Sequence, residues 1–225
     1  TFAQLVHPTC MGFGNTAVLT FRPNGEFEQA APGPCRGITE QAFIVSGARN
    51  WLSQSECETV RDLLAHTDIN TLPDRVIRAH WNVQHAAYQY FFEVRTLLVV
   101  SAVEALIHVR TNGRRGNSSS TGKQFKSRTV QLATELGIPF TEADADAVWN
   151  HRSDVAHGRD PWASRRDGKG TAQQPPELNR SEPVVKRYLT LEQILRTTVL
   201  KCLKDPAFAA RFESDESVAR NYAMQ

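Results

Sequence analysis

The sequence predicts a mostly α-helical protein with a small β-containing segment at its N-terminus. Two observations lead to this prediction: apolar residues recur with helical periodicity from Leu52 onward, and short β-like runs precede that point. The chain has 225 residues, 40% hydrophobic and 22% charged, which is an ordinary globular composition. We therefore expect an N-terminal β and turn segment over residues 1–50 and a helical domain over residues 51–225.

The N-terminal segment contains two strand candidates, residues 17–21 and 42–46, and the turn signal Pro-Asn-Gly at 23–25. Two or three short strands do not form an independent sheet. The segment therefore either packs on the rest of this chain or is the end of a domain that lies upstream.

The helical domain is divided by capping and stop signals. Ser55 is placed to cap a helix that runs to about residue 65. Pro73 can start a second helix, which continues or kinks into a long one over residues 86–109. A loop rich in Gly, Ser and Arg should then reach Gly122, and a polar segment should cover residues 159–186. The remaining helices are expected over residues 124–136, 141–157, 190–203 and 206–222, and Thr141 is placed to cap the second of these.

Charge and cysteine content limit the function classes. Four scattered cysteines without a CxxC pair give no zinc motif and no disulfide framework, so we expect a reduced cytoplasmic protein without a metal or other cofactor. No apolar run is long enough to span a bilayer, so we expect no membrane partner. The net charge is only +2, yet basic residues gather in one region as either a solvated face or a phosphate-binding patch. These RNA-binding candidates are Arg110, Arg114, Arg115, Lys123 and Lys126.

The most informative stretch is an arginine followed, five positions later, by a histidine at the end of an expected helix: Arg152 and His157. A histidine can move a proton and an arginine can neutralise charge on a phosphate, which is what cleaving RNA through its own 2′-hydroxyl requires. On an ideal helix the two are about 140° apart. They share a cleft only if the arginine stem wraps round the helix or the last turn unwinds. Asn150, Ser153 and Asp154 lie on the same face as His157 and are the further catalytic candidates.

Arg152 lies on a mostly apolar face and needs an acidic partner, because a buried unpaired charge costs several kcal/mol. Glu104 is an acid on an otherwise apolar stripe of the long helix, so we expect it to pair with Arg152. Arg128 also leans on an apolar face and is the alternative partner for Glu104. A purely structural ion pair remains an alternative interpretation of this arrangement.

Three segments together resemble the HEPN superfamily, and most closely its Apea-like HEPN domains. They are the Ser-Ala-Val-Glu-Ala-Leu stretch at 101–106, the Phe-x-x-Arg helix at 125–128, and Trp-Asn-His-Arg-Ser-Asp-Val-Ala-His-Gly at 149–158. The resemblance covers residues 76–222. It implies a HEPN-like helical bundle, a homodimer across the motif helix and metal-independent endoribonuclease activity. It also implies a role in bacterial antiviral defence or a toxin system, with other domains or subunits of that system as possible partners.

The resemblance implies a mechanism in which His157 transfers the proton, Arg152 stabilises the charged transition state, and RNA is left with a 2′,3′-cyclic phosphate. A dimer would bring a second His157 into the same groove and so supply both an acid and a base. One position departs from the family pattern: Ser153 follows the arginine, where Asn, Asp or His is usual. A non-catalytic HEPN module that binds RNA or mediates dimerisation is therefore the alternative.

Overall fold

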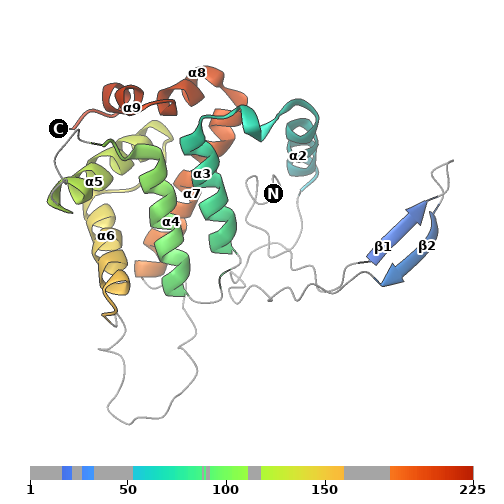
Figure 1. Cartoon of the computed structure of the whole chain (residues 1–225), viewed down its shortest axis with the longest axis horizontal. Coiled ribbons are helices and arrows are strands. Elements are labelled where there is room, and N and C mark those ends of the chain that lie inside the picture. The colour runs from blue at the N-terminus through green and yellow to red at the C-terminus, as the bar shows by residue number, and fades with distance from the viewer. Residues whose placement is uncertain are drawn as a thin grey trace, which may run out of the picture.

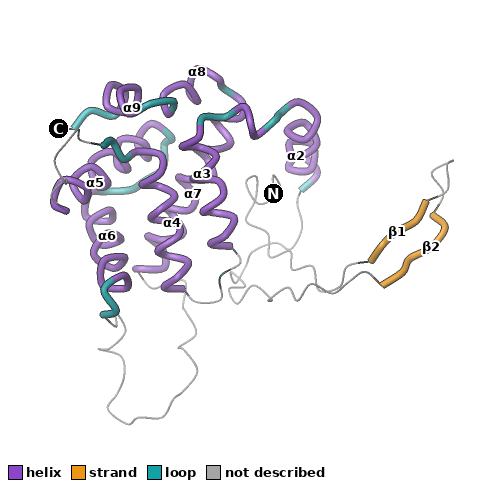
Figure 2. Tube along the Cα trace, viewed as in Figure 1, coloured by secondary structure: helices purple, strands orange, loops and turns teal. Residues whose placement is uncertain are grey.

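A computed structural model describes residues 17–21, 27–32, 53–87, 89, 92–110, 118–159 and 183–224 of the chain. Helices dominate these residues, so the predicted mostly α class is confirmed (Figure 2). None of the described helices is both long and apolar enough to cross a membrane.

Two strands precede the helices. Strand β1 (Ala17–Phe21) pairs antiparallel with β2 (Phe27–Pro32), and the register shifts between Thr20 and Phe21. Strand β1 coincides with a predicted strand, whereas β2 was not expected. The strand predicted at 42–46 and the turn at 23–25 lie outside the described residues, so a β segment over residues 1–50 stays a prediction.

Helix α2 (Gln54–His66) begins with a capping box. The Ser53 hydroxyl accepts a hydrogen bond from the Glu56 N–H, and the Glu56 carboxylate accepts one from the Ser53 N–H at 2.6 Å. The prediction that Ser55 caps this helix was therefore wrong by two positions, because the reciprocal bond to Glu56 favours Ser53.

Helices α3 (Asp74–Ala87) and α4 (Phe92–Ile107) are separate and pack side by side, instead of forming the predicted continuous or kinked helix (Figure 1). Helix α4 is strongly apolar and contacts α3, α5, α6 and α7, so it forms the centre of the bundle. A helix surrounded in this way must bury apolar residues on most of its circumference.

Helix α5 (Ser118–Glu135) begins earlier than expected, and it passes through Gly122 without a break. Its end is as predicted: Gly137 adopts φ +68°, and the Ile138 N–H bonds the Ala133 carbonyl at 2.9 Å. Helix α6 (Glu142–Ala156) then carries the Arg152 motif.

Helix α7 (Pro183–Lys204) starts seven residues before the predicted start at 190, with proline at its first position, where the missing N–H is harmless. The last predicted helix is broken into α8 (Pro206–Ala209), η3 (Ala210–Phe212) and α9 (Asp215–Asn221). Ser214 causes the break, since its hydroxyl caps α9 by accepting from the Ser217 N–H. A short 3-10 turn, η1 (Ile69–Thr71), joins α2 to α3.

The C-terminal end of α4 is held by side chains from its neighbours. Arg75 donates to the His108 carbonyl at 2.6 Å, and Arg128 donates to the Ile107 carbonyl at 2.8 Å. The Gln124 amide bonds both the N–H and the carbonyl of Val109. Two cations at the negative end of the helix dipole satisfy carbonyls that have no partner within the helix.

A buried polar network joins α4 to α7. The Arg95 Nε donates to the Tyr188 hydroxyl at 2.6 Å, and its Nη2 lies 3.1 Å from a carboxylate oxygen of Glu192. The Arg95 and Glu192 side chains are only 10% and 11% exposed. Burial, then the negative Glu192, raises the pKa of Tyr188, which keeps the phenol neutral. The pair fixes the register of α7 on α4.

We predict that Glu192→Gln destabilises the protein by about 3–5 kcal/mol, because it removes the negative charge that lies beside the buried Arg95 guanidinium. Urea unfolding followed by circular dichroism measures the change. The matched control is Asp154→Asn, which removes an ion pair to Arg159 with side chains 40% and 73% exposed. That control should stay within about 1 kcal/mol of wild type, and an equal loss in both variants would contradict the prediction.

A second prediction concerns the imidazole of His80, which is 6% exposed and whose Nδ1 has no hydrogen-bond partner among the described residues. Burial lowers its pKa to about 4. Between the ordinary pKa of 6.5 and about 4, the unfolded state therefore binds more protons than the folded state. The contribution of neutral, buried His80 to the free energy of unfolding is complete above this pH range and is lost as pH falls through it. The loss should be roughly 3 kcal/mol.

Urea unfolding of wild type and His80→Leu at several pH values between 7 and 4 tests this. The variant should lack the part of the pH dependence that His80 contributes. Burial also lowers the pKa of His108 and His151, but both are present in the two proteins and cancel in the comparison. The same pH dependence in both proteins would rule out His80 as its source.

Candidate functional site

Helix α6 is defined sharply at both ends. As predicted, Thr141 caps its start: its hydroxyl accepts from the Asp144 N–H, and the Asp144 carboxylate bonds the Thr141 N–H in return. Arg187 of α7 also reaches Asp144, at 2.8 Å. Hydrogen bonds from Thr141 and Arg187 lower the pKa of Asp144, so this carboxylate stays charged at the positive end of the helix.

His157 is the C-cap of α6. Its N–H still bonds the Ser153 carbonyl at 3.0 Å, so the last helical turn is intact. Gly158 follows with φ +67°, a conformation that glycine adopts without strain. The N–H groups of Gly158 and Arg159 bond the carbonyls of Val155 and Asp154, which closes the helix in a Schellman motif. The motif leaves the His157 imidazole exposed at the helix end.

Arg152 reaches the predicted partner: its Nη2 lies 3.4 Å from an oxygen of Glu104 on α4, and this ion pair is confirmed. The Arg152 and Glu104 side chains are 30% and 21% exposed, so the pair is half-buried. The guanidinium also lies over the ring of Trp149, 5.2 Å from its centroid. Its Nε is buried and has no hydrogen-bond partner among the described residues.

Burial is the dominant influence on Glu104 and raises its pKa, while the charge and hydrogen bond of Arg152 oppose that rise. Arg152 thus favours the ionised form of Glu104 inside the bundle. The ion pair therefore couples the protonation of the Glu104 carboxylate to the position of α6.

Arg128, the alternative partner for Glu104, lies elsewhere. Its side chain is buried and donates to the carbonyls of Ile107 and Tyr222 and to the Gln124 amide oxygen. The prediction that Arg128 can pair with Glu104 was wrong. Its N–H groups instead donate hydrogen bonds to backbone carbonyls at the end of α4 and near the C-terminus.

The remaining candidates on the motif face are engaged in surface contacts. Asn150 is exposed and donates to Asp146, which also forms an ion pair with Lys126 at 2.8 Å. The hydrogen bond and charge of Lys126 lower the pKa of Asp146. Asp154 pairs with Arg159 at 3.2 Å, and Ser153 is half-buried. Lys126 and Asn150 thus share one carboxylate, which links an expected RNA-binding residue to the motif face.

Arg152 and His157 lie at different levels of α6. The arginine head contacts Trp149, one turn toward the helix start, whereas His157 lies at the helix end. The last turn does not unwind, so one of the two routes to convergence within a chain is closed. A solvent-reachable cleft shared by the two residues stays a prediction.

The structure describes three of the five expected basic residues. Arg110 and Lys123 are exposed, and the Arg110 N–H donates to Asp215 at 2.7 Å. Lys126 lies on α5 against α6. Arg114 and Arg115 lie outside the described residues.

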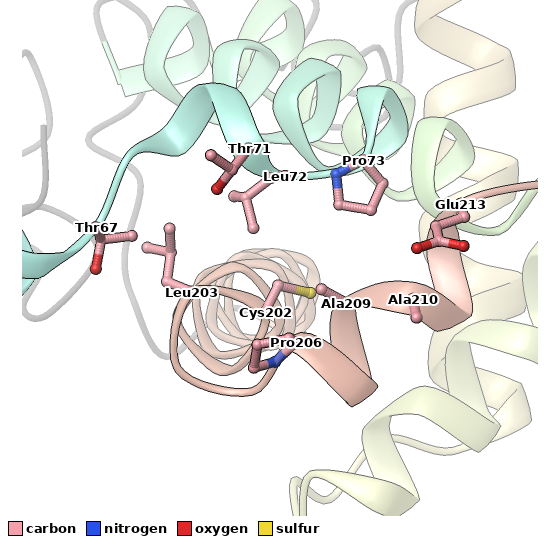
Figure 3. A pocket seen from close by; sticks show the side chains of 10 residues that line it. All are labelled: Thr67, Thr71, Leu72, Pro73, Cys202, Leu203, Pro206, Ala209, Ala210 and Glu213. Atoms are coloured by element: carbon pink, nitrogen blue, oxygen red, sulfur yellow. The ribbon is translucent and has the colours of Figure 1, made fainter.

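A cavity of about 290 Å³ lies between the segment that joins α2 to α3 and the C-terminal end of α7 with α8 and η3. Figure 3 shows its lining side chains. Its lining is mixed, with Cys202, Leu203 and Pro206 facing Thr71, Leu72 and Pro73. Burial raises the pKa of the Cys202 thiol to about 12, so it is not a ready nucleophile. The motif residues are not among its lining residues. In the described part of the chain, no three His, Cys, Asp or Glu side chains gather in a group that could hold a metal ion.

Trp149 was not singled out as a site residue, yet it contacts Arg152 directly. The spacing offered a signal, because an aromatic residue three positions before an arginine lies beside it on a helix. Gly122, where the sequence suggested a loop, is a helical residue pressed against the same indole ring.

Comparisons of this chain with protein-family models, with curated proteins and with solved structures found no match.

We predict that Arg152→Met lowers stability by about 1–3 kcal/mol at neutral pH, because Glu104 is left ionised and half-buried without a partner. Glu104 can relieve this cost by taking up a proton. Since its folded-state pKa is already raised by burial and will rise further without Arg152, the deficit should shrink as pH falls.

Urea unfolding at pH 7.5 and pH 5 checks this, with the double variant Arg152→Met, Glu104→Gln as the matched control. The double variant should recover much of the loss at pH 7.5 and show little pH dependence of the deficit. A deficit that is equal at both pH values in the single variant would mean that Glu104 is not stranded.

Proposed function

We propose that this chain is a HEPN-like, metal-independent endoribonuclease that acts as a homodimer. The observation that carries the proposal is the arrangement around α6. Arg152 is anchored to the central helix through Glu104, while His157 ends the same helix with its imidazole exposed. A cation held in place for a phosphate and an accessible proton carrier are the two groups that 2′-hydroxyl attack needs.

In the proposed reaction the ribose 2′-oxygen attacks the neighbouring phosphorus, and the bond from phosphorus to the 5′-oxygen breaks. One imidazole takes the proton of the 2′-hydroxyl, and an imidazolium gives a proton to the departing 5′-oxygen. The products are a 2′,3′-cyclic phosphate and a 5′-hydroxyl. Histidine suits both roles because its imidazole gains and loses a proton near neutral pH.

Arg152 would stabilise the charge that builds up on the non-bridging phosphate oxygens. Its guanidinium is a planar fork that binds two oxygens at once. The Glu104 contact at 3.4 Å is long for a charged hydrogen bond, and it involves one of the two Nη atoms. The second Nη is then the group that can meet a phosphate.

A dimer is part of the proposal for two reasons. The reaction uses an acid and a base, and each chain offers one His157. In addition, Arg152 and His157 lie at different levels of α6 within one chain. A two-fold axis near the end of α6 would bring two copies of His157 and two of Arg152 to one groove. The role of the protein in antiviral defence or as a toxin follows only from the HEPN resemblance and belongs to the same proposal.

One observation favours the second candidate function, a non-catalytic HEPN module that binds RNA or mediates dimerisation. Arg152 is occupied by Glu104 and Trp149. Asp154 and Asn150 are the two residues that could replace the polar group usual after the arginine, and Asp154 is paired with Arg159. Such a module would bind RNA with a steep dependence on salt and leave it intact.

The purified wild-type protein should cut single-stranded RNA in the presence of EDTA and leave DNA of the same sequence intact, because the nucleophile is the 2′-hydroxyl. His157→Ala should lower the rate by roughly 10²–10⁴-fold, and Arg152→Ala by a comparable factor. Gel electrophoresis gives the rate, and mass spectrometry of the fragments identifies the cyclic phosphate.

His85→Ala is the matched control, since His85 is another exposed histidine on a helix remote in sequence from the motif. It should retain wild-type activity. Equal activity in wild type and His157→Ala would assign the cleavage to a contaminant or to another site. Intact RNA with salt-sensitive binding would favour the non-catalytic module, and a monomer by light scattering at micromolar concentration would contradict the dimeric enzyme.

A further inference from the structure

Trp149 links the motif arginine to helix α5. Its ring packs against Phe125 of α5, with ring centroids 5.2 Å apart. The Arg152 guanidinium carbon also lies 5.2 Å from the centroid of the Trp149 ring. The indole thus contacts both helix α5 and the arginine head.

Gly122 allows the indole to come this close to α5. A Cβ atom at position 122 would lie 3.0 Å from the Trp149 Nε1 and 3.2 Å from its Cε2. Both distances are shorter than ordinary van der Waals contacts, and the atoms belong to a rigid ring. A glycine within a helix is less favourable than an alanine. The close contact with Trp149 is a structural reason for a glycine at this position.

The contacts of Arg152 restrict where its guanidinium can go. Glu104 holds Nη2 at 3.4 Å, the ring covers one side of the guanidinium, and Nε is buried without a hydrogen-bond partner among the described residues. An arginine on a free surface loses side-chain entropy when it is ordered by a ligand. Here the packing has already restricted the side chain, so a phosphate would meet a guanidinium fixed in one orientation.

From these contacts we propose that Trp149 is a positioning residue for Arg152 and that Gly122 is the residue that seats it. The ring gives a cation–π contact and a rigid surface, and it leaves the second Nη of Arg152 open for an anion. The catalytic meaning of this positioning rests on the proposed ribonuclease function. The positioning itself does not, so the two can fail separately.

The first test observes Arg152 without any activity assay. In a ¹H–¹⁵N spectrum of the uniformly labelled protein, Arg152→Lys identifies the Nε–H signal of Arg152 by its disappearance. In wild type this signal should exchange slowly with water and carry a ring-current shift from the indole. Trp149→Leu should abolish both properties, and Trp149→Phe should retain part of the shift because it keeps an aromatic face.

Trp81→Leu is the matched control, since Trp81 is 56% exposed, and it should leave the Arg152 signal unchanged. Gly122→Ala gives an independent approach that keeps every aromatic residue. By displacing the indole it should shift the Arg152 signal although neither Trp149 nor Arg152 is altered. If Trp149→Leu does not fold, Gly122→Ala and Trp149→Phe decide the matter. An Arg152 signal that keeps its wild-type position and exchange rate in the folded variants would overturn the proposal.

The second test concerns catalysis. Misplacement of a positioned group by about 1 Å can cost on the order of 10²-fold in rate. Trp149→Leu should therefore lower kcat by roughly 10- to 100-fold with KM little changed, and Trp149→Phe should recover part of that loss. Unchanged kinetics together with a shifted Arg152 signal would overturn the catalytic meaning. If wild type is inactive while the signal behaves as expected, the proposed function fails and the positioning stands.

Discussion

The burial of α4 constrains the rest of the structure. This apolar helix contacts α3, α5, α6 and α7, so any charge on it that faces the bundle must be paired within the protein. Arg95 meets Glu192 and Tyr188 on α7, and Glu104 meets Arg152 on α6. Each ion pair can form only when its two helices lie in one position relative to each other. The polar residues of α4 therefore set the positions of its neighbours, while the apolar residues provide the burial.

The same constraint links the fold to the proposed chemistry. Because Glu104 loses its counter-charge if α6 shifts, the helix that carries Arg152 is held in position by the stability of the bundle. The Schellman motif at Gly158 then fixes where α6 ends, and with it the location of His157. A catalytic arginine and histidine need this kind of fixed framework, since positioning contributes much of the rate of phosphoryl transfer reactions.

Local rules and simple pairing arguments predicted part of this arrangement. The mostly α class, the Thr141 cap and the Glu104–Arg152 pair followed from periodicity, capping chemistry and the rule that buried charges need partners. These predictions succeeded because each depends on residues near in sequence or on one strong electrostatic requirement. The catalytic roles, the dimer and the RNA substrate are in a different class and remain proposals.

Other features depend on contacts between distant residues. The start of α5 was placed too late because the need for Gly122 to meet Trp149 cannot be read from either segment alone. Arg128 was considered as an alternative partner for Glu104, yet it donates to carbonyls at the end of α4 and near the C-terminus, which only the assembled fold brings together. The start of α7 was different: Pro183 carried a known start signal, but the surrounding prolines favoured a loop.

The central claim is that Arg152 and His157 act on one phosphate. The most direct test is a titration of the protein with a 2′-O-methyl RNA oligonucleotide, which lacks the nucleophile and so cannot be cut, followed by NMR of both side chains. The account predicts that the Arg152 guanidinium and His157 imidazole signals shift together along one saturation curve. Binding that moves neither signal, or moves only one of them, would contradict it.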